Sequence, residues 1–226
     1  MTNDIQILHP RLDNLLDYAK RQGATAAEAE ISTDTGFAVT VRMGETESIE
    51  HQASQHAAIT VYFGQRTGSA SCTDFSETSL RLAAEKACII ARFTAEDDCA
   101  GLADASLMAT QYPDLDLYHP WQITTPEAIA LSLRCEQLAR EKDSRITNSE
   151  GVILNTGESY FIYGNSHGFR GFYPATRHSL NCSLIATQNN DMQRDHDFTV
   201  ARDAKELDDV TLLAQRVAER TVRRLG

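Results

Sequence analysis

The chain has 226 residues with a formal net charge of -11, and hydrophobic residues make up 42% and charged residues 23% of it. These values are ordinary for a soluble globular protein, and the length is enough for one large domain or two small ones. The negative charge argues against a surface that neutralises nucleic-acid phosphates, because such a surface needs clustered Lys and Arg.

The first residues and the cysteines both indicate a cytoplasmic protein. The start, MTNDIQILHP, lacks the basic beginning and the apolar core of a signal peptide. No run approaches the about 18 apolar residues of a membrane helix. The five cysteines are scattered, odd in number and never in C-x-x-C spacing. That pattern fits a reducing compartment better than a disulfide framework or a zinc knuckle.

The first part of the chain predicts a helix, a group of strands and a second helix. Apolar residues recur at steps of three and four between Pro10 and Gln22, which is typical of an amphipathic helix. Asp74 with Glu77 three residues later is a capping-box candidate for the second helix. Its apolar face is formed by Leu80, Ala84, Ala87, Cys88 and Ala91. Strands are expected at 28–33, 37–43, 47–53, 57–63 and 68–73.

An acidic stretch follows. Residues 93–120 contain six acids and no Lys or Arg, together with Gly101, Pro113 and Pro120, which predicts a long surface connection. The acids could bind a cation, but they lack the ordered spacing of a calcium loop. We therefore interpret the stretch as a solvated acidic loop.

The second part repeats the order of the first. Thr125 is expected to cap a third helix, with Pro126 in its first turn. Strands are predicted at 146–155, 159–163, 177–187 and 192–200, and a last helix at 206–224. The repeated order suggests a duplicated helix–strands–helix unit. We predict an α+β fold of antiparallel sheets with packed amphipathic helices. Its expected parts are a first subdomain at 1–95, an acidic connecting loop at 96–124 and a second subdomain at 125–226.

The segment Gly164–Gly168 fits the G-x-S-x-G pattern of a serine-hydrolase nucleophile elbow, with Ser166 as the nucleophile. Such an elbow continues into a helix, but the residues that follow contain two glycines, three aromatics and a proline within seven positions. The alternative is a glycine-rich hairpin or bulge between two strands. A serine hydrolase is kept as a third functional hypothesis.

Other polar side chains have two interpretations each. In a strand His178 shares a face with Leu180 and Cys182, so a hydrogen-bonded histidine at the edge of an apolar face is predicted. Arg177 could bind a carboxylate or a peptide carbonyl, or form a structural ion pair. The three acids Asp191, Asp195 and Asp197 could hold a hard cation. We favour an exposed strand face that its charge protects from edge pairing.

No metal motif is present in the sequence. A zinc peptidase usually carries two His one helical turn apart with a general-base Glu, and the chain has neither H-E-x-x-H nor a longer variant of it. We therefore predict no metal site within these residues, no cofactor in this chain and no catalytic residue.

Six segments occur in this order: ITVYFGQRTGSASCTD (59–74), DLDLYHP (114–120), RITNSEG (145–151), GNSHG (164–168), TRHSL (176–180) and DMQRD (191–195). Together they resemble the PmbA/TldD family, and specifically its PmbA branch, which is also called TldE. The resemblance runs from about Ala29 to the last helix. Family members are roughly twice as long, so the chain resembles only their N-terminal half.

The resemblance implies a peptidase system. In this family a TldD-type subunit carries a metal-binding H-E-x-x-x-H motif, and a PmbA-type subunit pairs with it and lacks a complete motif. Together they process unfolded or short peptides, in roles such as microcin maturation and antitoxin removal. We expect a non-catalytic partner of a TldD-type zinc subunit, with zinc in that partner. The alternative is a stand-alone protein-binding module from a truncated gene.

Two further expectations concern contacts. Ser166, His167, Arg177 and His178 are predicted to touch a substrate or a partner. The family also carries an older label, modulator of DNA gyrase. The negative charge suggests that such an effect would run through protein contacts and not through DNA.

Overall fold

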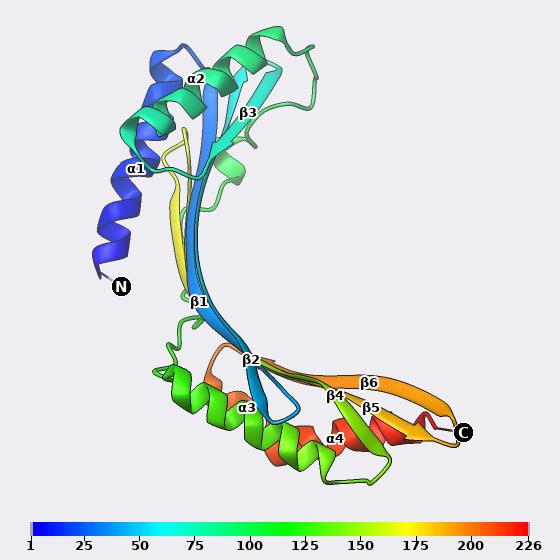
Figure 1. The fold of residues 1–226 in the computed structure, drawn as a ribbon. Helices are drawn as coiled ribbons and strands as arrows, with labels where there is room; N and C mark the ends of the chain where they lie inside the picture. The colour runs from blue at the N-terminus through cyan, green and yellow to red at the C-terminus, as the bar shows by residue number, and fades with distance from the viewer. Residues whose placement is uncertain (1, 226) are drawn as a thin grey trace. The chain divides into compact units, whose positions relative to one another are not determined.

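The computed structural model describes residues 2–225, and its element order repeats once along the chain (Figure 1). The first half contains α1 (Thr2–Arg21), β1 (Ala26–Arg42), β2 (Glu45–Phe63), β3 (Arg66–Cys72) and α2 (Glu77–Phe93). The second half contains α3 (Thr125–Arg140), β4 (Ile146–Asn165), β5 (Arg170–Gln188), β6 (Asp191–Ala201) and α4 (Val210–Arg223). Both halves therefore read helix, three strands, helix, and the predicted α+β class is confirmed.

The strands form one six-stranded sheet in the order β3-β2-β1-β4-β5-β6. Tight turns join the antiparallel neighbours. Phe63 pairs with Arg66 across the turn from β2 to β3. Gln188 pairs with Asp191 across the turn from β5 to β6, where Asn189 and Asn190 adopt φ angles of 50° and 69°. Left-handed φ values at both central residues are typical of the two-residue turns that match strand twist.

Several strands are longer than the sequence indicates. The predicted breaks near residues 34–36, 54–56 and 156–158 lie inside β1, β2 and β4. Gly36 looks like a turn residue, but a Cβ there would collide with the backbone of Thr156 and Gly157. The glycine therefore permits a close approach of two backbone segments and does not end the strand.

The chain divides into two compact units, each built from three segments. Unit 1 contains residues 1–34, 53–116 and 159–174, and unit 2 contains residues 35–52, 117–158 and 175–226. These units differ from the continuous subdomains expected at 1–95 and 125–226, because the long strands β1, β2, β4 and β5 contribute residues to both.

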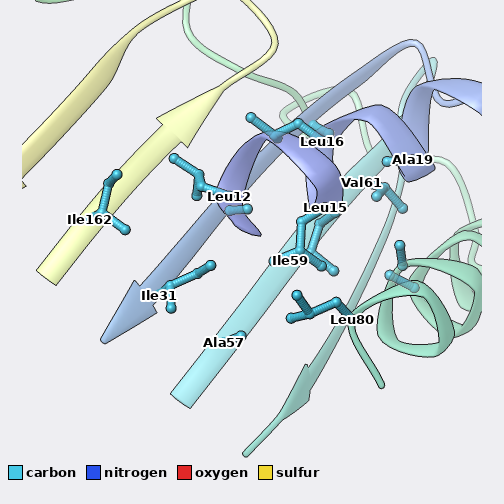
Figure 2. Packing of buried hydrophobic residues seen from close by; sticks show 14 of the residues in the cluster. Leu12, Leu15, Leu16, Ala19, Ile31, Ala57, Ile59, Val61, Leu80 and Ile162 are labelled. Atoms are coloured by element: carbon cyan, nitrogen blue, oxygen red, sulfur yellow. The ribbon is translucent and has the colours of Figure 1, made fainter. Parts of the chain in front are cut away.

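The core of unit 1 (Figure 2) joins helices α1 and α2 to residues of the four strands β1, β2, β4 and β5. Leu12 and Leu15 of α1 pack with Ile31, Ile59 and Ile162 of the strands, and all five are at most 1% exposed. The predicted apolar face of α2 is confirmed, since Leu80, Ala84, Ala87, Cys88 and Ala91 are all buried there. Burying a leucine or isoleucine side chain of this core contributes about 1.5–3 kcal/mol. Gly68 of β3 lies so close to Ala87 and Ala91 that a Cβ would overlap the helix backbone.

The core of unit 2 lies between one sheet face and the helices α3 and α4. It contains Val39, Val41, Val152, Leu154, Leu180, Leu184, Leu213 and Val217, each at most 2% exposed. Thr124 is the N-cap of α3, and it forms a capping box with Glu127. The predicted cap, Thr125, was one residue late. Because Thr124 satisfies helix N–H groups that would lack partners, this box fixes where α3 begins.

Three other helix boundaries differ from the sequence expectations. Helix α1 begins at Thr2 and contains Pro10 inside it. The N-cap of α2 is Ser76, not Asp74. The segment after β6 forms a short 3-10 turn at Ala204–Glu206 before α4 begins.

The stretch 94–124 is a long connection, as predicted, with one short 3-10 turn at Ala105–Leu107. Among residues 2–225 no helix combines the length and apolar character that crossing a membrane requires.

Candidate functional site

The G-x-S-x-G motif is a turn between two strands. Strand β4 ends at Asn165 and β5 begins at Arg170. The Ser166 N–H donates to the Ala27 carbonyl at 2.8 Å, and the Ala27 N–H donates to the Ser166 hydroxyl at 3.1 Å. The serine is thus fixed to the start of β1. No helix follows it, so the predicted hairpin is confirmed and the structural context of a nucleophile elbow is missing.

Buried Asn165 organises this turn. Its side-chain oxygen accepts the N–H groups of His167 at 3.1 Å and Phe169 at 3.4 Å, and its own N–H donates to the Phe169 carbonyl. Gly168 has a φ of 95°, a left-handed conformation that glycine adopts without strain. The turn therefore holds the side chains of Ser166 and His167 at the surface, where both are exposed.

A cavity of about 340 Å³ lies beside this turn in unit 1. Three segments line it: the end of α1, the start of β1 and the turn itself. Its polar lining consists of Asp17, Lys20, Thr25, Asn165, Ser166, His167 and Arg170. The sequence patterns did not identify the α1 residues, because they are far from the motif in the chain.

The positive charge of Arg170, which lines the cavity, is neutralised by an acidic side chain of α1. The Arg170 guanidinium pairs with Asp13 at 2.8 Å and donates to the carbonyls of Asn165 and Phe169. Within residues 2–225 no hydrogen bond links Ser166 to a histidine, and its hydroxyl oxygen accepts from the Ala27 N–H. The hydroxyl proton can still be donated to a ligand. Among the described residues, Ser166 therefore has an exposed hydroxyl but no hydrogen-bonded base that would activate it as a nucleophile.

Arg177 and His178 lie in unit 2 and have opposite environments. His178 is fully buried, as the strand alternation predicted. Its Nε2 lies 2.9 Å from the His119 carbonyl and its Nδ1 lies 2.8 Å from the Thr156 hydroxyl. A carbonyl can only accept, so Nε2 carries the proton and Nδ1 accepts from Thr156. Arg177 is exposed. Of the two, Arg177 is the residue that a ligand can reach in this conformation.

The acidic residues Asp195 and Asp197 of β6 do not lie on an exposed strand face. Asp197 pairs with Arg216 at 2.7 Å, and Asp195 pairs with Arg220 at 3.5 Å; both side chains are about seven-eighths buried. Burial opposes ionisation of Asp195, but the hydrogen bond from the His196 N–H and the charges of Arg220 and Arg224 lower its pKa overall. The predicted exposed face is therefore wrong for Asp195 and Asp197, because the arginines of α4 cover it.

A second polar cluster, which the sequence patterns did not reveal, is centred on Glu28. Its carboxylate accepts the hydroxyl groups of Tyr62 and Tyr163, each at 2.8 Å. Burial, and then the hydrogen bond to Glu28, raise the pKa of Tyr62 to about 12. Both tyrosines therefore remain protonated donors at neutral pH. A cavity of about 310 Å³, lined by Glu28, Glu30 and Tyr163, lies beside the cluster.

In the part of the chain that the structure describes, no three His, Cys, Asp or Glu side chains come together as a metal site. The described residues therefore offer no ligand set for a zinc ion.

The sequence of this chain matches known proteins over nearly its whole length. A family model described as PmbA/TldA metallopeptidase domain 1 matches residues 27–91, and one described as the central domain of that metallopeptidase matches residues 118–225. Metalloprotease PmbA of Escherichia coli O157:H7 is 40% identical over 98% of this chain. A PmbA homolog of Haemophilus influenzae is 37% identical over the same share. The chain spans about half of each relative, 49% of its length.

Solved structures share the fold. A Bacteroides thetaiotaomicron protein named for modulation of DNA gyrase matches with a TM-score of 0.88 at 22% identity, over 96% of this chain and 50% of that one. TldE from Thermococcus kodakarensis matches with a TM-score of 0.75 at 18% identity, over 94% of this chain and 47% of that one. From the matched models and the identity to its relatives, the chain belongs to the PmbA/TldD metallopeptidase family.

Proposed function

We propose that this chain is the N-terminal region of a PmbA/TldE-type, non-catalytic subunit that works in the cytoplasm. It pairs with a TldD-type zinc metallopeptidase subunit, and the two process unfolded or short peptides. The zinc ion and the catalytic residues belong to the TldD-type subunit. This chain supplies contacts to the partner and to the peptide.

The observation that carries the proposal is the 40% identity to metalloprotease PmbA across 98% of the chain. Identity at this level over both compact units supports a shared role and not only a shared fold. The name of the structural neighbour TldE supports the assignment to the same branch.

The geometry around Ser166 supports a binding role. The exposed hydroxyl and the His167 ring lie at the rim of a cavity that offers both donors and acceptors. Main-chain amides of an extended peptide need such groups, and binding through them depends little on peptide sequence. In unit 2, the exposed Arg177 guanidinium is a separate donor that fits a carboxylate or a carbonyl.

Degradation of an unstructured peptide tests the proposal. The chain alone, a TldD-type subunit alone and the mixture are each assayed with and without a metal chelator. The proposal expects activity in the mixture and loss of that activity with chelator. Equal activity of the TldD-type subunit with and without this chain contradicts it. Chelator-resistant activity of the chain alone, together with labelling of Ser166 by a fluorophosphonate probe, would establish a serine hydrolase instead.

A further inference from the structure

A further cavity, of about 470 Å³, lies within unit 2 beside helix α3. It is lined by the second half of α3, by Gly44 in the turn between β1 and β2, and by Ile146 at the start of β4. We call it the α3 cavity. Its volume falls within the range of about 300–1,000 Å³ that is typical of small-ligand sites.

Three of the polar side chains that line the α3 cavity have partners within the chain. Both carboxylate oxygens of Glu136 accept backbone N–H groups of the turn between β1 and β2. The side-chain amide of Gln137 donates to the Glu141 carboxylate at 2.9 Å. These side chains therefore need no ligand to complete their hydrogen bonding.

Arg140 differs from these neighbours. It lines the same cavity, and its Nε is buried and has no acceptor among residues 2–225. Buried polar groups normally have a hydrogen-bond partner, so a buried donor without one calls for an explanation. A guanidinium is always charged, and its N–H groups fit the oxygen of a carboxylate or of a carbonyl. The unsatisfied arginine therefore indicates that an acceptor from outside the chain enters the cavity.

The other lining residues select between a carboxylate and a carbonyl. Two acidic side chains, Glu136 and Glu141, line the cavity with the single guanidinium of Arg140. A carboxylate on the ligand would be repelled by both acids, whereas an uncharged carbonyl would not. Leu133 and Ile146 also line the cavity, and they favour an apolar group on the ligand.

We propose that the α3 cavity binds one apolar residue from within a peptide. The apolar side chain lies against Leu133 and Ile146, and the uncharged backbone carbonyl of the same residue accepts a hydrogen bond from Arg140. This inference rests on the proposed function, because it names the class of residue that the subunit binds in a substrate. Folded proteins bury most of their large apolar residues, so such a site favours unfolded or short peptides.

An NMR titration of the chain with N-acetyl-leucinamide tests the inference, because this probe carries an apolar side chain between two uncharged amides. We expect a Kd in the millimolar range, on the order of what a ligand of this size reaches. The signals of the Ile146 methyl groups and of the Arg140 Nε–H should shift. N-acetylglycinamide lacks the apolar side chain and N-acetyl-leucine carries a carboxylate, so each should bind about tenfold more weakly.

Arg140→Met tests the role of the arginine. The variant keeps the length and the apolar stem of the side chain but removes its donors, so we expect the Kd for N-acetyl-leucinamide to rise by about tenfold. Because Nε has no partner within the described residues, the midpoint of thermal unfolding should not fall. The matched control is Arg134→Met, which is exposed on the same helix outside the cavity and should leave the Kd unchanged.

Each outcome decides one part of the inference. Equal affinity of the wild type and Arg140→Met overturns the role of Arg140, and so does a lower unfolding midpoint of the variant, which would assign the arginine a structural role. Tighter binding of N-acetyl-leucine than of the amide overturns the choice of an uncharged residue. No binding of the amide by the wild type overturns the whole inference.

The titration uses no TldD-type subunit, so its outcome is separate from the peptide-degradation test. Binding of the amide together with failed degradation in the mixture overturns the proposed function and supports the cavity as a binding site. Successful degradation without binding of the amide overturns the inference and leaves the proposed function intact.

Discussion

The buried carboxylate of Glu136 in α3 accepts the backbone N–H of Gly44 at 2.8 Å, and its other oxygen accepts the N–H of Met43 at 2.9 Å. Met43 and Gly44 form the turn between β1 and β2, and both have left-handed φ values. A helix side chain therefore replaces water as the partner of a hairpin turn. Since both oxygens are used and the residue is 1% exposed, this contact anchors the turn within unit 2.

Glu136→Gln should destabilise unit 2. The amide keeps one acceptor oxygen, but its NH2 group would face a backbone N–H that needs an acceptor. We expect a loss of about 2 kcal/mol in the free energy of unfolding, measured by urea denaturation. Glu141→Gln, five residues further along at the C-cap of α3 and exposed, is the control and should change little. Equal stability of the two variants would show that the Glu136 contact is not important.

His178 and Arg177 should respond differently to substitution. His178→Phe removes the partner of the Thr156 hydroxyl and of the His119 carbonyl in a buried place, so we expect a loss of about 3 kcal/mol. Arg177→Ala changes an exposed side chain and should leave stability within about 0.5 kcal/mol. If Arg177 contacts peptide, its variant lowers peptide processing at unchanged stability. Unchanged processing by both Arg177→Ala and His167→Ala would argue against peptide contact at these positions.

Asp74 should make the beginning of α2 sensitive to acid. Hydrogen bonds from the hydroxyls of Ser79 and Ser76 lower the pKa of Asp74 from 3.8 to about 2. Because the folded-state pKa is below the unfolded one, the stabilisation is complete above about pH 4 and is lost as pH falls toward 2. NMR titration of the carboxyl group measures the pKa directly. In Asp74→Asn the unfolding free energy should fall less steeply over this range, and an unchanged slope would refute the assignment.

Gly68→Ala should push α2 away from β3 and so destabilise unit 1. The new Cβ would overlap backbone atoms of Ala87 and Ala91, and neither can move as a flexible side chain would. We expect about 3 kcal/mol of destabilisation, at the upper end of the usual cost of overpacking. Gly157→Ala is the control, since its nearest neighbour is the Thr35 carbonyl at 3.3 Å. A lower midpoint of thermal unfolding for Gly68→Ala than for Gly157→Ala is the expected result.

Much of the fold follows from periodicity. The apolar face of α2 and the buried side of β5 were predictable because alternation and helical spacing survive in a single sequence. Strand lengths were not predictable. Gly36 looks like a turn residue but lies inside a long strand, and only the packing of one backbone on another shows why glycine is needed at that position.

The candidate site was predicted in part. The motif at 164–168 identified Ser166 and His167, and the context correctly favoured a hairpin over a helix. The α1 residues that line the cavity and the Glu28 cluster come from distant segments, so no local pattern could join them. The exposure of Asp195 and Asp197 was predicted wrongly because the arginines that cover them belong to α4, 25 and 19 residues further along the chain.

Because unit 1 is built from three separate segments, its core can form only after the last of them has been synthesised. Its core needs Ile162 and Phe172 as well as Leu12 and Ile31, so more than two thirds of the chain must leave the ribosome before that core can close. Until then, the N-terminal helix and strands present unfinished apolar surface. Exposed apolar surface of this kind promotes aggregation and wrong assembly during synthesis. We expect residues 1–95 produced alone to aggregate, and chain production paused before residue 174 to need chaperone protection.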